Sequence, residues 1–209
     1  MSAPLPEQRA DEQQYVPLTV WLGETTPPPG LSPSTLLRAI ALFSQPNEAI
    51  VTIDGPPGVH AAADYLHRRL HTTARHTGTG MVTPAGGSFP CHTAGLVIDY
   101  QPDMVDATVD DFPDPFLADY IHVRGILRPG GIFLVVIAPV RPQLDGLART
   151  ITAARGAGLR YLQHIVVVTA PVTDDRLAPP VAGLPVDGRF LIPVHTDLAV
   201  FTTSGGRRA

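Results

Sequence analysis

The segment from Ala49 to Gly58 constrains the fold of this chain more than any other. Ala49–Ile53 is a run of apolar and β-branched residues, and the turn Asp54–Gly58, with the sequence Asp-Gly-Pro-Pro-Gly, follows it directly. A strand that leads into a glycine-containing turn and then a helix is the unit of open α/β sheets. Nucleotide-like cofactors bind at such turns, because free backbone N–H groups and the helix N-terminus face the ligand. Pro56 and Pro57 have no N–H, so the segment predicts a cofactor site with fewer donors than usual.

Strands and helices are expected to alternate along the rest of the chain. Strands are predicted at 95–100, 132–137, 160–170 and 197–202, with a short one around Met81 and Val82. Helices are predicted at 35–43 with Ser34 as the N-cap, from Gly58 to about His71, at 119–127 and at 143–157. The glycines Gly130 and Gly131 are interpreted as a tight structural turn. This alternation predicts a parallel α/β sheet. No helix separates the last two strands, so we expect an antiparallel pair at the sheet edge.

The composition fits one globular domain. The chain has 209 residues, of which 44% are hydrophobic and 16% charged. We expect an N-terminal arm and loop at 1–33, the domain at 34–205 and a tail at 206–209. No apolar run has the length of a membrane span, and the polar N-terminus lacks the apolar core of a signal peptide. The lone Cys91 excludes an internal disulfide. These features predict a cytoplasmic protein with no membrane partner.

The charged residues are unevenly distributed along the chain. The net charge is −4, which gives no general attraction for nucleic acid. No Asp or Glu lies between Tyr65 and Ile98, whereas seven Asp residues lie from Asp99 to Asp119. We interpret the arginines of the first segment, Arg68, Arg69 and Arg75, as a solvated face rather than a phosphate site. Nucleic acid is therefore a partner that the charge does not support.

Two further sets of residues have both a functional and a structural interpretation. Trp21 and Tyr15 suit stacking on a base or packing on the sheet edge, and we favour packing. His67 and His71 are four residues apart on the expected helix, a spacing that metal ligands use. The residues between them lack the glutamate of a zinc hydrolase helix, so no metal site is predicted. The alternative zinc site would draw on the nearby residues His60, His76, Cys91 and His92.

Several of these segments resemble one family in order and spacing. Arg124–Gly131, which ends in Leu-Arg-Pro-Gly-Gly, resembles the segment that leads into a strand of class I S-adenosylmethionine-dependent methyltransferases. Leu96–Asp99 is similar to that family's fourth strand, whose end carries the catalytic motif, and His195–Phe201 is similar to part of its closing hairpin. The resemblance implies a Rossmann-like class I methyltransferase fold, with a mostly parallel sheet and an antiparallel C-terminal strand.

The N-terminal half is similar, more narrowly, to amino-methylating DNA methyltransferases of actinobacteria. Phe43–Asp54 follows the first conserved phrase of those enzymes, and Ala94–Pro102 follows the strand before their catalytic loop. The likeness covers roughly residues 34–203. It implies S-adenosylmethionine as the cofactor, bound by Asp54, Gly55 and Gly58, and it places Asp99 and Pro102 at the catalytic position.

The chain departs from the family pattern at three places. The cofactor turn keeps its acid and two glycines but loses the donors at Pro56 and Pro57. The family holds the ribose hydroxyls with an acid at the end of its second strand, and here the acid-free segment 65–98 covers that position. The family's Ser/Asp/Asn-Pro-Pro-Tyr/Phe loop grips the target amino group and stacks an aromatic side chain on the flipped base. Asp99-Tyr100-Gln101-Pro102 replaces that loop.

Both acids also have a structural interpretation, and three functions stay open. Asp54 would otherwise cap the following turn or helix, and Asp99 would be a strand-end acid that faces solvent. The leading hypothesis is a pseudoenzyme related to DNA methyltransferases, with weak or no S-adenosylmethionine-dependent activity. The second is an active methyltransferase for a nucleic-acid base or a small molecule, because methyl transfer needs mainly alignment of the reactants. The third is a non-catalytic interaction subunit, and formation of a homo-oligomer would support this hypothesis.

Overall fold

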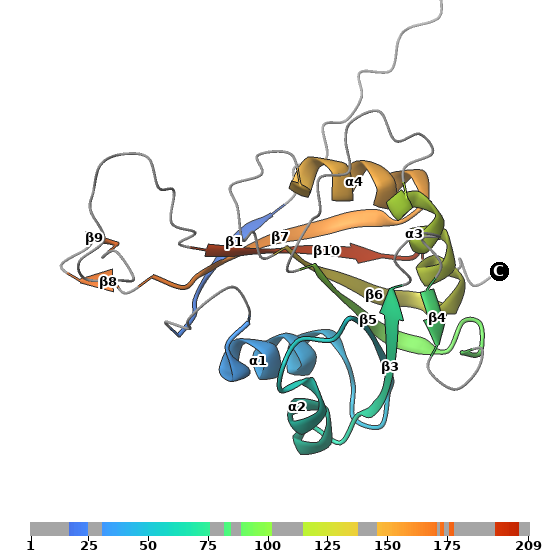
Figure 1. Cartoon of the computed structure of the whole chain (residues 1–209), viewed down its shortest axis with the longest axis horizontal. Helices are drawn as coiled ribbons and strands as arrows, with labels where there is room; N and C mark the ends of the chain where they lie inside the picture. The colour runs from blue at the N-terminus through green and yellow to red at the C-terminus, as the bar shows by residue number, and fades with distance from the viewer. Residues whose placement is uncertain are drawn as a thin grey trace, which may run out of the picture.

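The computed structural model describes residues 17–24, 31–75, 82–84, 89–101, 115–137, 146–170, 172–173, 176–177 and 195–204. In this part of the chain, an eight-stranded sheet forms the middle layer, and helices cover both of its faces (Figure 1). The strands are β1 (Leu18–Leu22), β2 (Ala49–Ile53), β3 (Arg69–Arg75), β4 (Val82–Pro84), β5 (Ala94–Gln101), β6 (Leu127–Ile137), β7 (Arg160–Val168) and β10 (His195–Thr202). The helices are α1 (Pro33–Phe43), α2 (Val59–Tyr65), α3 (Pro115–Ile126) and α4 (Gly146–Gly156). The short strands β8 (Val172–Thr173) and β9 (Arg176–Leu177) pair separately from this sheet.

The sheet is mostly parallel, as predicted. Its strand order is β1-β7-β10-β6-β5-β2-β3-β4. The pairs β1–β7, β6–β5, β5–β2 and β2–β3 are parallel, whereas β10 is antiparallel to both β6 and β7 and β4 is antiparallel to β3. The predicted antiparallel C-terminal strand is therefore confirmed. Its predicted place at the sheet edge is wrong, because β10 lies between β6 and β7 and β1 pairs with the outer side of β7.

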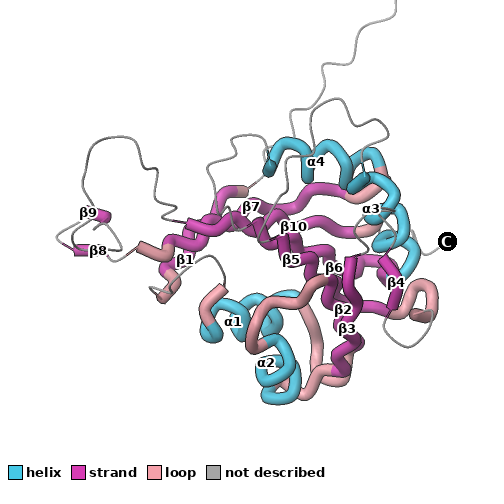
Figure 2. Tube along the Cα trace, in the orientation of Figure 1, coloured by secondary structure: helices cyan, strands magenta, loops and turns pink. Residues whose placement is uncertain are grey.

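Helices α1 and α2 lie on one face of the sheet and α3 and α4 on the other (Figure 2), and each face has its own hydrophobic core. Along β5 the side chains alternate, so that Leu96, Ile98 and Tyr100 join the core beneath α1 and α2, and Val97 joins the core beneath α3 and α4. All residues of β5 are buried, as expected for a central strand of a parallel sheet with both faces covered. In the core beneath α3 and α4, Tyr161 packs on Phe201, with ring centroids 5.1 Å apart. Burial, reinforced by the Asp197 carboxylate, raises the pKa of Tyr161 to about 12, so its phenol stays neutral at physiological pH.

Helix α1 begins two residues earlier than predicted. The N-cap is Ser32, whose Oγ accepts a hydrogen bond from the backbone N–H of Thr35 at 3.2 Å, and not Ser34. Pro33 fits the first helical position because its missing N–H would have no partner there. The predicted apolar face is present, with Leu36 and Ile40 fully buried. This face packs α1 against the sheet beside Trp21 of β1.

Strand β1 confirms the structural interpretation of Trp21. The indole is 3% exposed, and the guanidinium of Arg38 lies 4.3 Å from its ring centroid. The ring therefore packs into the α1 side of the core. Tyr15 lies outside the described residues.

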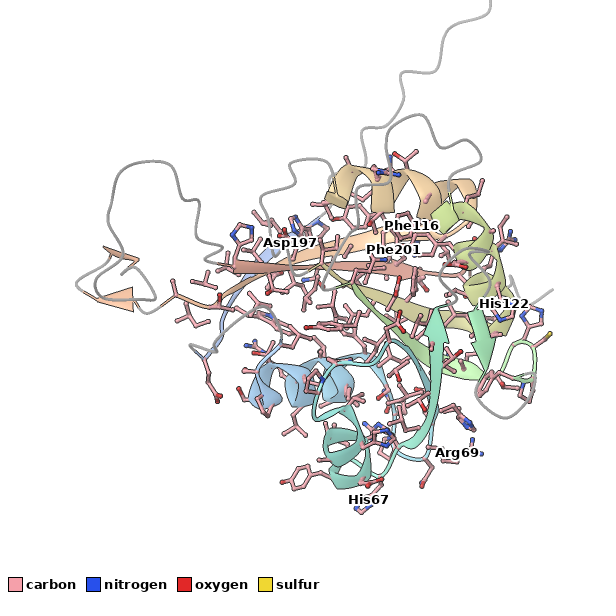
Figure 3. All side chains as sticks on the ribbon, in the orientation of Figure 1. His67, Arg69, Phe116, His122, Asp197 and Phe201 are labelled. Carbon is pink, nitrogen blue, oxygen red and sulfur yellow. The ribbon has the colours of Figure 1, made fainter. Side chains whose placement is uncertain are left out.

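The predicted helix from Gly58 to His71 is too long. Helix α2 ends at Tyr65, and the chain enters the parallel strand β3 at Arg69. His67 adopts the left-handed backbone conformation, with φ 55°, which no helix continues through. The side chain of His67 lies on the outside of the molecule beyond the end of α2 (Figure 3). His67 and His71 thus share no helix face, and the premise of the zinc alternative is wrong.

Arg68 anchors this crossover from inside the protein. Its guanidinium donates to the Oγ of Ser44 at 2.8 Å, to the carbonyl of Ser44 at 2.9 Å and to the carbonyl of Leu66. Arg68 is buried, so the prediction that it belongs to a solvated face is wrong. Arg69 is exposed as predicted and donates to the carbonyl of Asn47 at 3.0 Å. The side chain of Arg75 lies outside the described residues.

Three further segments differ from the sequence prediction in their boundaries. The turn at Gly130 and Gly131 exists, but it bulges out of β6, because Leu127 pairs with Ala94 and Ile132 pairs with Leu96. Gly130 has φ 71°, which favours glycine there. Helix α3 begins at Pro115 rather than 119, and residues 143–145 of the predicted last helix lie outside the described residues. The predicted short strand near Val82 corresponds to β4.

Replacing Arg68 should destabilise the protein more than replacing its exposed neighbour. In Arg68→Met, the carbonyls of Ser44 and Leu66 lose a buried charged donor, and we expect the free energy of unfolding to fall by about 2–3 kcal/mol. Arg69→Met, the matched control, should change it by no more than about 0.5 kcal/mol. Urea denaturation of the two variants measures the difference, and equal losses would contradict the anchoring role.

Candidate functional site

The predicted site residues gather where β2, β3 and β5 end. These strands are parallel neighbours, so their carboxyl ends lie at the same edge of the sheet, which is where ligands bind in open α/β folds. Ile53, the last residue of β2, pairs with Asp99 of β5 on one side and with Thr73 of β3 on the other. The turn that begins at Asp54 therefore lies between the ends of β3 and β5.

The turn after β2 is exposed except for one proline. Asp54, Gly55, Pro57 and Gly58 are exposed, whereas Pro56 is buried. Asp54 adopts the left-handed conformation, with φ 49°, and its backbone N–H donates to the carbonyl of Thr73 at 3.0 Å. The N-cap of α2 is Gly58, with φ 83°, and no side chain caps this helix. Gly58, and not Asp54, therefore occupies the N-cap position of α2.

Gly55 is required by the close approach of the turn to its own strand. A Cβ at this position would lie 2.8 Å from the Oγ1 of Thr52 and 3.3 Å from a methyl group of Val59. The Oγ1 of Thr52 is buried and has no hydrogen-bond partner among the described residues. Any larger residue at position 55 would push the turn away from β2, so this glycine keeps the turn in place.

The end of β3 carries no acid beside the turn. After Thr73, which is hydrogen-bonded to the turn, the strand ends with the exposed Ala74 and with Arg75. β3 is the parallel strand next to β2, so its end is the place where the family pattern has the ribose-binding carboxylate. The lack of an acid in the segment 65–98 thus falls at the carboxyl end of β3, beside the turn.

Asp99 does not face solvent. It is completely buried, and its Oδ2 accepts a hydrogen bond of 2.6 Å from the Nε2 of Gln101. The same amide lies 3.0 Å from the hydroxyl of Tyr120 on α3. Tyr120 is itself buried and packs edge-on against Phe133, with ring centroids 4.9 Å apart. The solvent-facing interpretation of Asp99 is therefore wrong, and the carboxylate belongs to a buried polar cluster of Asp99, Gln101 and Tyr120.

Gln101 is the member of this cluster that sequence reasoning missed. It is 4% exposed, and its Oε1 has no hydrogen-bond partner among the described residues. A buried acceptor without a donor costs free energy, so this oxygen is available to an N–H or O–H group. The signal in the sequence was its spacing of two from Asp99, which puts both side chains on the same face of the strand.

The aromatic residue of the predicted catalytic segment faces the opposite way. Tyr100 packs into the core beneath α1 and α2 and is 9% exposed. Its ring is therefore not placed to stack on a base beside Asp99. Pro102, the other predicted catalytic residue, lies outside the described residues.

The histidines of the zinc alternative do not assemble into a metal site in the described part of the chain. There, no group of three or more His, Cys, Asp or Glu side chains has an arrangement that could hold a metal ion. His71 lies edge-on to Phe89 with ring centroids 4.8 Å apart, and the Nδ1 of His92 lies 3.3 Å from the carbonyl of Leu127. Cys91 is exposed, and His76 lies outside the described residues.

Comparison with known proteins identifies the fold. No protein family and no curated protein sequence matches the chain. Among solved structures, a TehB-like S-adenosylmethionine-dependent methyltransferase from Corynebacterium glutamicum superposes with a TM-score of 0.51 at 12% identity, over 81% of this chain and 87% of that one. A precorrin-6y C5,15-methyltransferase from Geobacter metallireducens superposes with a TM-score of 0.50 at 12% identity, over 82% of this chain and 87% of that one.

These likenesses confirm the predicted Rossmann-like fold of class I methyltransferases. At 12% identity they show the fold and not the activity. No helix among the described residues is long and apolar enough to cross a bilayer.

The hydrogen bonds of the buried polar cluster should stabilise the fold, and their contributions should be coupled. In Gln101→Leu, the Asp99 carboxylate loses its 2.6 Å donor, and we expect the free energy of unfolding to fall by about 2–3 kcal/mol. Tyr120→Phe removes the hydrogen bond that the hydroxyl accepts from Gln101 and should cost about 1 kcal/mol. Urea denaturation of both single variants and the double variant measures the coupling. Strict additivity of the two losses would contradict a connected cluster.

Proposed function

We propose that this protein is a methyltransferase-fold protein, related to the DNA methyltransferases, in which S-adenosylmethionine binding and methyl transfer are weak or absent. The observation that carries the proposal is the end of β3. It lies beside the cofactor turn, tied to Asp54 through Thr73, and it offers Ala74 and Arg75 where an acid would accept the ribose hydroxyls.

The missing acid has a direct energetic consequence. A hydrogen bond to a charged group contributes about 1.5–3 kcal/mol, and about 1.4 kcal/mol corresponds to a tenfold change in affinity. Loss of one such bond should weaken cofactor binding by roughly tenfold to a hundredfold. Pro56 and Pro57 remove two further backbone donors from the same turn.

The acceptor side supports the same proposal. A residue that grips a target amino group must present an oxygen beside the cofactor, and an aromatic ring must stack on the base. The carboxylate of Asp99 instead accepts a hydrogen bond from Gln101 inside the protein, and Tyr100 belongs to the core. Neither side chain is oriented for these two tasks.

The residues present fit the cofactor only in part. Asp54, Gly55 and Gly58 form an exposed turn at the correct edge of the sheet and would hold its methionine end. When bound, S-adenosylmethionine supplies an activated methyl group. The turn therefore supports residual binding of a related ligand more than it supports catalysis.

Isothermal titration with S-adenosylmethionine and S-adenosylhomocysteine tests the proposal. We expect no binding in the micromolar range for either ligand, because the ribose acid and two turn donors are missing. Any heat of weaker binding should disappear in the Asp54→Ala variant if the ligand binds at this turn. Micromolar binding of either ligand to the unaltered protein would overturn the proposal.

A second candidate, an active methyltransferase for an amine or a base, is favoured by one observation. The Oε1 of Gln101 is a buried acceptor with no donor in the described part of the chain, next to the carboxylate of Asp99. A substrate amine, which would be the methyl acceptor, would donate a hydrogen bond to this oxygen. Transfer of label from a radioactive methyl donor to DNA or to small amines should then occur, and Asp99→Ala should abolish it. Labelling that persists in Asp99→Ala would remove Asp99 from this mechanism.

A further inference from the structure

Strand β1 is the last strand on one side of the sheet among the described residues. On its inner side, the carbonyl of Pro17 accepts from the N–H of His164 at 3.0 Å, and the N–H of Gly23 donates to the carbonyl of Val168 at 2.8 Å. Backbone groups alternate in direction along a strand, so those of Leu18, Val20 and Leu22 point away from β7. Among the described residues, no strand pairs with this outer side. Within the described part of the chain, these three residues therefore present N–H and C=O groups with no strand partner at the edge.

The same three residues also carry exposed apolar side chains. Leu18 is 64% exposed, Val20 59% and Leu22 74%. Proteins usually protect an edge strand with a charged side chain, a proline or a bulge. From Leu18 to Gly23 the strand has none of these, and Pro17 directs its carbonyl to the inner side. The edge is therefore shaped to accept another strand.

We propose that β1 pairs with β1 of a second copy of this chain, antiparallel, about a twofold axis through Val20. The exposed row reads Leu, Val, Leu and is the same in both directions, as the self-complementary patch of a twofold interface requires. In this register Leu18 lies opposite Leu22 of the second copy, and Val20 lies opposite Val20. Every outward N–H and C=O of the three residues then finds a partner, because residues opposite each other form hydrogen-bonded pairs.

The surroundings of β1 support a second copy as the occupant. Val20 and Leu22 pair with the half-buried Val166 and Val168 of β7, so the apolar row continues from β7 across β1 into the second copy. No charged side chain lies within the row, so two copies meet without like-charge repulsion. A shift by one residue would place inward-facing groups at the interface, so the hydrogen-bonding pattern excludes odd shifts, and only the axis through Val20 pairs all three apolar residues with one another. β1 is also far from β2 in the strand order, so the pairing leaves the cofactor turn free.

Light scattering on the full chain after size-exclusion chromatography tests the proposal. We expect the mass of a dimer for the unaltered protein and loss of the dimer in Val20→Lys, which brings two ammonium groups together at the axis. Leu42→Lys is the matched control, since Leu42 is an apolar residue on α1 with a similar exposure of 58%, and this variant should stay dimeric. A monomeric unaltered protein, or a Val20→Lys variant that stays dimeric, would overturn the proposal.

Disulfide trapping decides the register and does not depend on the folding of Val20→Lys. Directly opposed residues of a hydrogen-bonded antiparallel pair have Cα atoms about 5.5 Å apart, which is within the range of a disulfide. In a Cys91→Ser background, Val20→Cys should therefore form a covalent dimer on mild oxidation. Leu42→Cys in the same background should remain a monomer on denaturing gels. Equal cross-linking of the two variants would contradict pairing at Val20.

Discussion

The parallel pairing of β2 with β5 and β3 organises both the sheet and the candidate site. All five residues of β2 are buried, so its backbone hydrogen bonds must be made within the sheet and its side chains must be covered on both faces. Parallel neighbours need crossover connections, and here α2 provides one of them. The same pairing brings the ends of β2, β3 and β5 to one edge of the sheet. The cofactor turn and the acid of β5 become neighbours for that reason.

The crossover from β2 to β3 shows how this constraint is met with a short connection. Helix α2 has seven residues, and the left-handed His67 turns the chain back toward the sheet. Arg68 is buried there and donates hydrogen bonds to the carbonyls of Ser44 and Leu66. The shortened crossover leaves β3 ending on Ala74 and Arg75 beside the turn, and this ending carries the proposal that cofactor binding is weak or absent. The crossover from β2 to β3 thus shapes the fold and also supports the proposed loss of activity.

Much of the architecture could be predicted from the sequence because its signals are local. The apolar runs of β2, β5 and β6 and the exposed turn at Asp54 are consequences of residue type and spacing. The end of α2 could not be predicted, because Arg68 is stabilised by Ser44, which lies 24 residues away. Gln101 escaped notice because a glutamine has no catalytic signature, and its role depends on Tyr120 from α3. The burial of Asp99 could not be predicted either, because it too depends on residues from other parts of the chain.

The sequence alone predicts a mostly parallel α/β sheet, the Asp-Gly-Pro-Pro-Gly turn after its first central strand and the lack of any acid from residue 65 to residue 98. These properties follow from the hydrophobic pattern and from residue identity, which need no partner elsewhere in the chain. The strand order, with β10 between β6 and β7 and β1 at the edge, depends on tertiary packing. So do the inward direction of Asp99 and the outward direction of Leu18, Val20 and Leu22. The reason is that burial and strand pairing are properties of neighbours in space, and a one-residue difference in direction reverses which face a side chain occupies.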